Sequence, residues 1–397
     1  MTELTVTGHE TVDDFGETQW DTLVRQSDLG SVFHRHGWLR AVERGLDRRA
    51  AHFVVRKGSN PVAVLPNFRV PVDLPDRSTL RDALESSLAD RFDSPSPVDR
   101  LPTGALGALS TVAGAPADVS ADAFGSLPVE RLCSTAPGFG GPIVLTDEAD
   151  CLDMLFDALE DALSESTLCH VVRAKEPAFM RYGKFLAGRG YAPTLLDCRF
   201  VLDADRPFEE VLDGMAKERR KAVRDARERE YAVTERPLAE TLDETYERYL
   251  RDMERAGGDP YPRSFFAALA ADLPERTRVF SAEVDGVAAG QYVYLLDDEQ
   301  SAVHYFFSAI GDAANYEYNP TELLHSHVVE WARERGYDDY DFGSTGSTFR
   351  DGTFKYKEKY GARVVPTLRW ERGDSPVLWN AYRLARRGYQ RYAYPDT

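Results

Sequence analysis

Lysine is scarce in this chain of 397 residues, because only eight of its 48 lysines and arginines are lysines. Acidic residues outnumber basic ones, and the formal net charge is −18 at pH 7. Net charge bears on solubility and association rather than on fold. These features predict a protein suited to the salty cytoplasm of a halophile. They disfavour binding to DNA and to nucleic acid in general, since contacts with phosphates weaken steeply as salt rises.

Long apolar runs and known cofactor motifs are also missing. No stretch approaches the roughly 18 apolar residues of a membrane-spanning helix, and the first ten residues do not have the pattern of a secretory signal. We therefore expect a cytoplasmic protein without a transmembrane segment. The four cysteines show no CxxC spacing, which is typical of small buried side chains. No Walker loop, GxSxG elbow or dinucleotide fingerprint occurs, so we expect no permanently bound cofactor.

Two His-x-His pairs, at 34–36 and 325–327, are weak candidates for a metal site. Residues two apart on a helix face different ways, and no nearby carboxylate stands at ligand spacing. We interpret both pairs as structural and expect no metal.

Hydrophobic residues make up 43% of the chain and charged residues 29%, as in ordinary globular proteins. Helical and strand patterns alternate, which favours an α/β (α+β) fold with mixed, largely antiparallel sheets flanked by helices. The same order of elements occurs twice and predicts two tandem domains, at 1–205 and 206–375. Residues 73–128 have little periodicity and are expected to form a loop insertion, with one candidate helix at 80–91. A tail helix is expected within 376–397.

The second half has the clearer pattern. The expected helices are 207–230, 242–256, 264–271 and 320–335. The expected strands are 277–284, 287–296, 301–310, 338–342 and 363–370, after a strand at 194–202 that closes the first half. Asp-Gly between the first two apolar runs of the second half is a strong hairpin signal.

Three antiparallel strands, a loop, a helix and a returning strand match the core of GNAT acyltransferases. Three segments strengthen the likeness: KERRKAVRDARE at 217–228, YDDYDFG at 337–343 and FKYKEKYG at 354–361. They resemble the BioF2-like acetyltransferases and the Fem-type (FemAB-like) peptidyltransferases, which are built from tandem GNAT domains. The resemblance implies an N-acyltransferase that moves an acyl group to an amine of a small molecule or envelope precursor by direct attack.

The identity of the acyl donor stays open at this point. Acyl-CoA is the default co-substrate, and aminoacyl-tRNA is the alternative, which the net charge disfavours. A third hypothesis is a ligand-binding module that has kept the fold and lost the chemistry. For the aromatic and basic tail at 377–392, we favour docking onto the second domain over binding to a membrane surface.

Acyl transfer to an amine requires that the amine lose a proton and that the developing oxyanion be stabilised. Lys357 is the candidate cation for the oxyanion or a donor phosphate. Lys355 is a candidate for binding substrate or phosphate. With Lys355 and Lys359, Lys357 is expected to line one face of an extended segment, and the alternative is a solvated edge strand. Asp341, beside Gly343, is the candidate general base, or else a residue that caps the turn.

A basic face is expected on the helix that contains 217–229. Arg220, Arg224 and Arg227 are spaced at i, i+4 and i+7 and so share a face. Arginine can bind a phosphate in a bidentate manner, which makes Arg220 and Arg224 candidates for an anionic ligand. The alternative is a solvated helix with many salt bridges. The resemblance implies that Arg220 lies where Fem-type enzymes contact a phosphate.

Three tyrosines complete the set of candidates. Tyr305, on the third strand of the second half, is a catalytic candidate. Tyr316 and Tyr318 lie in the loop at 311–319, where a GNAT protein binds the pyrophosphate of CoA, and are candidate donor-binding residues. That loop is acidic and nearly free of glycine, whereas glycine-rich backbone at a helix N-terminus is what cradles a pyrophosphate. The departure argues against acetyl-CoA as the donor.

Overall fold

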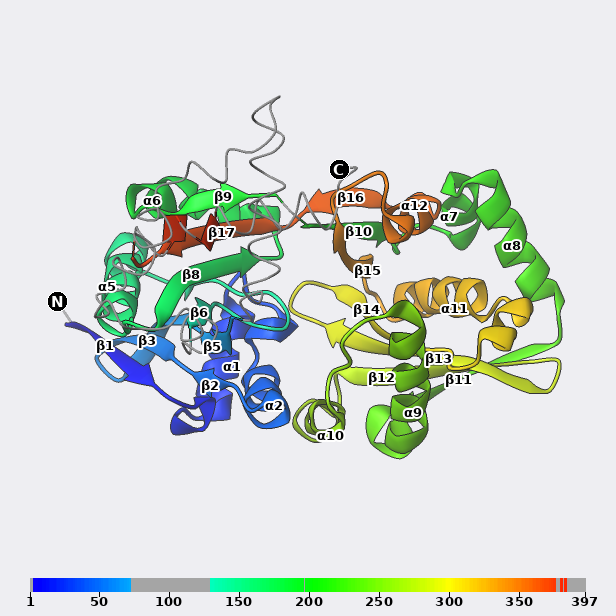
Figure 1. The fold of residues 1–397 in the computed structure, drawn as a ribbon, viewed down its shortest axis with the longest axis horizontal. Coiled ribbons are helices and arrows are strands. Elements are labelled where there is room, and N and C mark those ends of the chain that lie inside the picture. Colours follow the sequence, from blue (N-terminus) through cyan, green and yellow to red (C-terminus); the bar gives the residue numbers. More distant parts are fainter. Residues whose placement is uncertain (1–2, 73–128, 196, 376–378, 381, 384–397) are drawn as a thin grey trace, which may run out of the picture.

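The structure is a computed structural model that describes residues 3–72, 129–195, 197–375, 379–380 and 382–383. The expected insertion at 73–128, with its helix, and most of the tail at 376–397 lie outside these residues. Within them, no helix combines the length and apolar character that crossing a bilayer requires. The molecule has two lobes of mixed sheet with helices packed on them (Figure 1).

One seven-stranded sheet forms the C-terminal lobe. Its order in space is β11 (Tyr231–Pro237), β12 (Thr277–Val284), β13 (Val287–Asp297), β14 (Ala302–Ala309), β15 (Asp339–Gly346), β10 (Asp197–Asp203) and β16 (Arg363–Pro366). All neighbours are antiparallel except β14 and β15, which run parallel. The three antiparallel strands predicted between 277 and 310 are confirmed.

Helices cover both faces of this sheet. They are α7 (Phe208–Gly214), α8 (Lys217–Glu228), α9 (Leu238–Ala256), α10 (Arg263–Asp272), α11 (Pro320–Glu334) and α12 (Gly352–Glu358), with a 3-10 helix at Ala313–Tyr318. The single helix expected over 207–230 is wrong, because Met215 and Ala216 have extended backbone. There the N–H of Ala216 donates to the carbonyl of Lys359, a tertiary contact that helical periodicity does not report.

Two smaller sheets form the N-terminal lobe. The first contains β1 (Leu4–His9), β3 (His52–Lys57), β4 (Asn60–Leu65) and β7 (Ile143–Val144). The second contains β2 (Arg49–Ala50), β5 (Phe68–Pro71), β6 (Glu130–Cys133), β8 (Thr167–Ala174), β17 (Leu368–Gly373) and β9 (Ala192–Thr194). The helices here are α1 (Glu17–Gln26), α2 (His36–Leu46), α5 (Glu148–Asp161) and α6 (Gly183–Gly188), with 3-10 turns at Val12–Asp14, Val32–His34 and Pro177–Tyr182.

The two lobes exchange strands. β10 leaves the N-terminal lobe and lies between β15 and β16, while β17 returns from the C-terminal lobe and lies between β8 and β9. Each lobe then has the same order: a parallel pair (β6 and β8, or β14 and β15), the exchanged strand, and an edge strand. The single strands expected at 194–202 and 363–370 are therefore each two strands in different sheets. A mixed α/β fold with sheets flanked by helices is confirmed.

A common core joins the lobes. It contains Trp38 of α2 together with Phe265 of α10, Val293 of β13 and Phe307 of β14. The helices α2 and α10 approach closely, since a Cβ atom at Gly45 would lie 2.6 Å from the Cα of Phe265. This packing brings the ends of β8, β13, β14 and β15 together at the lobe interface.

Candidate functional site

The strands β14 and β15 pair over only three residues and then separate. Ala302, Val303 and His304 face Asp339, Tyr340 and Asp341, and His304–Asp341 is the last pair. Within the described residues, the backbone of 305–309 pairs with β13 on one side and with no strand on the other. The sheet therefore opens beyond His304 and Asp341, and the side chains around that opening form the candidate site.

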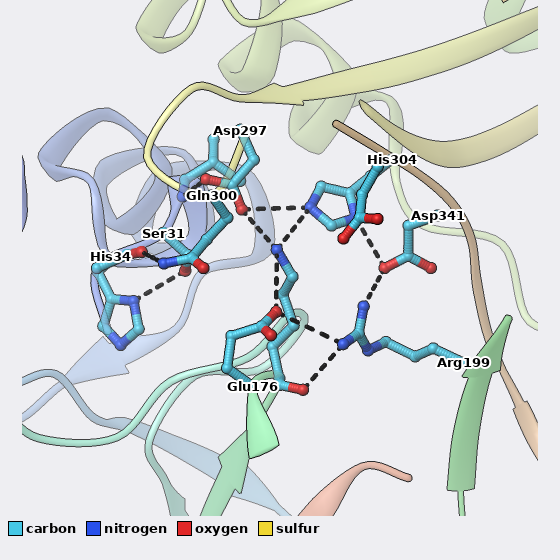
Figure 2. A network of polar contacts seen from close by, with 12 residues as sticks. Ser31, His34, Glu176, Arg199, Asp297, Gln300, His304 and Asp341 are labelled. Atoms are coloured by element: carbon cyan, nitrogen blue, oxygen red, sulfur yellow. Dashed lines mark hydrogen bonds and ion pairs between the residues drawn. The ribbon is translucent and has the colours of Figure 1, made fainter. Parts of the chain in front are cut away.

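A closed network of charged side chains lies at the root of the opening (Figure 2). The imidazole of His304 is placed between two carboxylates, with Nε2 3.3 Å from Oδ2 of Asp297 and Nδ1 3.1 Å from Oδ2 of Asp341. Lys175 Nζ donates to Oδ2 of Asp297 at 2.9 Å and lies 3.3 Å from His304 Nε2. Arg199 forms an ion pair with Asp341 and donates to the carbonyl of Lys175 at 2.9 Å.

Asp297 and Asp341 are both ionised near neutral pH. Burial would raise the pKa of Asp297, but Lys175 and His304 outweigh burial and hold that pKa well below its usual range. The pKa of Asp341 is lowered in the same way, because Arg199 and His304 outweigh the effect of burial. The other oxygen of each carboxylate accepts a backbone N–H, from Val32 for Asp297 at 2.9 Å and from Gly343 for Asp341 at 2.8 Å.

The network crosses the lobe interface. Lys175 follows β8 of the N-terminal lobe and Arg199 lies on the exchanged strand β10, whereas Asp297, His304 and Asp341 belong to β13, β14 and β15. Phe33 of the N-terminal lobe packs on the His304 ring, with centroids 5.4 Å apart. The site thus depends on both halves of the sequence.

Lys357 lies on the short helix α12 next to the opening. It is 6% exposed, and its Nζ donates to the carbonyls of Gly343 and Ser344 at 3.0 Å each. Burial lowers the pKa of Lys357 to about 8, although the carboxylate of Asp341 acts in the opposite direction. The ammonium has a third N–H, and no hydrogen bond from it to any described residue is formed. This group can therefore serve a ligand bound beyond the end of the β14–β15 pairing.

The extended segment expected for the three lysines is wrong. Residues 352–358 are helical, with Asp351 accepting the N–H of Thr353 at the N-terminus. Lys355 is exposed, while Lys359 pairs with Glu218 at 2.7 Å. Helical geometry points side chains two residues apart in different directions, so only Lys357 faces the interior.

Tyr305 faces the opposite side of β14 from His304. Its ring packs against Tyr292 and His325, with centroids 4.6 and 5.1 Å apart. Burial raises the pKa of Tyr305, so the phenol keeps its proton. His325 is buried and neutral, because burial lowers its pKa well below the usual value, and its Nδ1 lies 2.5 Å from the hydroxyl of Tyr340. His325 is thus part of an aromatic cluster, as is typical of a structural histidine.

Two of the arginines on the basic helix α8 form ion pairs with glutamates of α11. Arg219, which the sequence did not single out, forms an ion pair with Glu322 and lies over the rings of Tyr356 and Tyr360. Arg227 forms an ion pair with Glu330 of α11.

Arg220 and Arg224 are the arginines left toward solvent on this helix. Arg220 is half-buried, and its NH1 lies 3.2 Å from Asp213. Arg224 is exposed and makes no ion pair with any described residue. α8 and α12 are neighbours, as the Lys359–Glu218 pair shows, but no contact joins Arg220 to Lys357 among the described residues.

The backbone N–H groups at the start of the loop after β14 already bind a carboxylate of the protein, that of Asp252. Asp252 of α9 accepts the N–H groups of Ile310 and Gly311, at 2.9 and 2.8 Å, and the hydroxyl of Ser308 at 2.5 Å. Arg255 donates to the same carboxylate at 2.7 Å and to the hydroxyl of Tyr316 at 3.0 Å.

Tyr318 lies under the guanidinium of Arg229, 4.8 Å from the ring centroid. Tyr316 and Tyr318 both belong to the 3-10 helix at Ala313–Tyr318, and among the described residues neither has a hydrogen bond to the charged network. The backbone donors of Ile310 and Gly311 are satisfied before any ligand binds.

Sequence reasoning missed most of the charged network. Lys175, Arg199, Asp297 and His304 were not among the candidates. Asp297 stands at the start of an acidic turn, which concealed it. The one available signal was Lys175, because lysine is uncommon in this chain. Among the described residues, no group of three or more histidine, cysteine or acidic side chains is placed to hold a metal, and the four cysteines are buried thiols.

Comparison with known proteins identifies the domain that contains the opening. Residues 214–358 match the model of the GNAT acetyltransferase domain. A search of curated proteins by sequence finds no match. Residues 214–358 are thus similar to a GNAT acetyltransferase domain, which supports an acyltransferase activity.

Among solved structures, FemX is similar along nearly the whole length. It is 13% identical, with a TM-score of 0.62, and the match covers 92% of this chain and 96% of FemX. A tandem GNAT protein from the clavulanic acid biosynthesis pathway is 14% identical over 94% of this chain and 99% of its own, with a TM-score of 0.49. L-PGS from Bacillus licheniformis is 13% identical over 64% of this chain and 82% of its own, with a TM-score of 0.44. The likeness to FemX is one of fold.

Proposed function

We propose that the protein is an N-acyltransferase whose reaction takes place where β14 and β15 separate. The observation that carries this proposal is the separation itself, beyond the His304–Asp341 pair, within the segment that matches the GNAT acetyltransferase domain. The acceptor is an amine of a small molecule or envelope precursor. Its nitrogen attacks the carbonyl carbon of the donor, the bond to the leaving group breaks, and the leaving group takes up a proton while the amine loses one.

Lys357 is assigned to the developing oxyanion. A cation with a hydrogen-bond donor in a water-poor site stabilises such a charge far more than it would in bulk water. The two carbonyls that Lys357 holds fix the direction of its remaining N–H. Below its pKa of about 8 the side chain is a cation, as this role requires.

Asp341 and Tyr305 take supporting roles in this proposal. A carboxylate with so low a pKa is a weak proton acceptor near neutral pH, so Asp341 is assigned to holding Gly343, Arg199 and His304 rather than to base catalysis. Tyr305 keeps its proton, because burial raises its pKa, and its hydroxyl is assigned to donate a hydrogen bond to the leaving group.

The donor is the main point for experiment. Acyl-CoA is the default for this class of domain. Against it, Asp252 occupies the two N–H groups at the start of the loop where a pyrophosphate would be expected, and a second anion there would meet like charge. That observation favours the second candidate, aminoacyl-tRNA, which the Fem-type resemblance also implies. Arg220 and Arg224 are the candidate contacts for the phosphates of either donor.

Transfer assays with the purified chain test the proposal. Acetyl-CoA and a mixture of charged tRNAs, each with a labelled acyl group, are supplied with a panel of amines, and labelled amide is measured. We expect product with one donor and a loss of about 100-fold or more in rate for Lys357→Ala, as for removal of one oxyanion donor in other enzymes. Full activity of that variant would remove Lys357 from the mechanism. Absence of product and of any thermal shift with both donors would favour the non-catalytic module.

A further inference from the structure

A small pocket lies beside the charged network, between the lobes. It encloses about 130 Å³. The wall residues that matter here carry both signs of charge: Lys175, Arg199 and Arg363 are cations, and Glu176, Asp339 and Asp341 are carboxylates. A pocket of this size holds a few non-hydrogen atoms rather than a coenzyme, and walls of both signs complement a ligand that itself carries both.

The six charged side chains differ in how closely they are paired with one another. Asp341 and Lys175 have close partners in the network. Glu176 is held more loosely: it forms ion pairs with Lys175 and Arg199 at the longer distances of 3.4 and 3.5 Å, and neither is accompanied by a hydrogen bond within the described residues. Figure 2 shows Glu176 next to Arg199 at the edge of the network. The Glu176 side chain is 27% exposed, which leaves its carboxylate accessible to an ammonium group.

Arg363 is the matching cation on the other wall. It comes from β16, the strand beyond the exchanged strand β10, and it is 54% exposed. Among the described residues, its side chain pairs with Asp339 alone, with NH2 2.9 and 3.0 Å from the two oxygens. Part of its guanidinium therefore remains for a carboxylate or phosphate of a ligand, as is common for an arginine in an anion site.

We propose that this pocket binds the amine acceptor as a small zwitterion, with the ammonium on Glu176 and the anionic group on Arg363. The inference rests on the proposed function, because the ligand is an acceptor only if the protein transfers an acyl group. It specifies the class of acceptor as an amine that carries a carboxylate or a phosphate. The pocket includes Asp341, the last residue of β15 paired with β14, so an amine held here lies next to the opening where the acyl group is proposed to bind.

Calorimetric titration of the full chain tests the binding site without any need for turnover. The zwitterionic probes are glycine, β-alanine and phosphoethanolamine, and the comparison probes are methylamine and acetate, each with one charge. We expect at least one zwitterion to bind and to bind at least tenfold more tightly than either singly charged probe. Preference for phosphoethanolamine over the two amino acids identifies a phosphate as the anionic group, and the reverse identifies a carboxylate.

Three variants locate the binding. Glu176→Gln and Arg363→Gln are each expected to weaken zwitterion binding at least tenfold. Val365→Phe, which fills the pocket from β16 without changing charge, is expected to abolish it. The matched controls are Glu244→Gln and Arg263→Gln, two exposed members of ion pairs elsewhere, and they are expected to bind as the wild type does. Circular dichroism checks that each variant folds, and only the folded variants are compared with the wild type.

The outcomes separate this inference from the proposed function. The pocket assignment would be overturned if no zwitterion bound, or if the zwitterions bound no more tightly than the singly charged probes. It would also be overturned if every folded variant bound the zwitterion as the wild type does. An active transferase whose KM for the acceptor is unaffected by Glu176→Gln and Arg363→Gln would overturn it as well, while leaving the transferase proposal intact. Zwitterion binding in a chain that transfers no acyl group would keep the pocket and contradict the transferase proposal.

Discussion

His304 Nδ1 lies 3.1 Å from Oδ2 of Asp341, across the last residue pair that joins β14 to β15. The contact ties together the two strands at the point from which they diverge. Two cations from the other half of the chain bind the same cluster: Lys175 pairs with Asp297, and Arg199 pairs with Asp341. The relationship thus links the geometry of the opening to the docking of the two lobes, and changes at this pair should affect both stability and activity.

Replacement of Asp341 by asparagine should be strongly destabilising. The change keeps the shape of the side chain but leaves Arg199 and His304 without their shared counter-charge in a buried site. Removal of one partner from a buried ion pair costs about 3–5 kcal/mol. Urea unfolding followed by circular dichroism measures the loss. The control is Asp243→Asn, an exposed partner of Arg263, for which a change below about 0.5 kcal/mol is expected.

The carboxylate of Asp341 also predicts how the stability of the fold depends on pH in acid. Because the folded pKa of Asp341 lies below the usual 3.8, the unfolded chain takes up a proton first as the pH falls. Its contribution to stability is thus complete above about pH 4 and is lost below that value. The wild type should lose stability more steeply than Asp341→Asn in that range. Parallel curves for the two proteins would show that the ion pair contributes little.

Lys357 should give a pH dependence of the same sign, in the alkaline range. Its pKa is about 8 in the folded protein and 10.5 in the unfolded chain. Between these values the unfolded chain binds more protons, so stability rises with pH, by up to about 3 kcal/mol in total. Lys357→Met should remove this rise. Denaturant unfolding between pH 7 and 10.5 measures it, and Lys355→Met, at an exposed site on the same helix, serves as the control.

Arg220 and Arg224 should matter for the donor and little for the fold. Both lie toward solvent on α8, and among the described residues the polar side-chain contacts of Arg220 are with Asp213 and Arg224 makes no ion pair. Alanine at either position should change the free energy of unfolding by less than about 1 kcal/mol. If these residues bind phosphate, KM for the donor should rise severalfold, and the rise should shrink as salt increases. An unchanged KM in the double variant would place the phosphate elsewhere.

The sequence predicted the C-terminal sheet well, because its signals are local. Alternating apolar residues and Asp285-Gly286 define β12 and β13, and the run Pro320–Glu334 has helical periodicity with proline in its first turn. The strand exchange was not predictable, since β10 and β17 have the same local pattern as strands that stay in their own lobe. Only long-range pairing distinguishes them, and a single sequence carries no record of it.

The site was predicted only where one residue was unusual in itself. Lys357 stood out because lysine is rare in this chain, and the structure places it at the opening of the sheet. Its neighbour Lys355 shared the same signal but lies outside, because the segment is a helix rather than a strand. Asp297, His304 and Arg199 act as one network with Asp341 only through tertiary packing. The separation of 142 residues between Arg199 and Asp341 leaves no local spacing to detect.

Asp252 should hold the loop after β14 in place. Alanine at this position removes the acceptor of two buried backbone N–H groups, of Ile310 and Gly311, at a cost of about 1–3 kcal/mol for each donor left unsatisfied. The protein should therefore lose stability and gain faster hydrogen exchange at these two amides. Glu254→Ala, on the exposed side of the same helix, is the control. Unchanged exchange would show that other groups hold the loop.

Trp370 provides the test of the strand exchange. It lies on β17, near the C-terminal end of the described chain, yet it is buried in the N-terminal lobe, where its ring faces Gly183. Alanine in its place should cost about 3–5 kcal/mol, as for other large aromatic residues in a core. Val364→Ala, on the preceding strand β16 and 50% exposed, should cost less than about 1 kcal/mol.

The location of the damage distinguishes the exchanged arrangement from two self-contained lobes. If β17 completes the N-terminal sheet, Trp370→Ala should increase hydrogen exchange at β8 and β9, its two neighbours, more than at β13. Because Trp38 and Phe265 belong to one core that spans both lobes, the loss of stability should appear in a single unfolding transition. Increased exchange confined to the C-terminal sheet would contradict the pairing of β17 with β8.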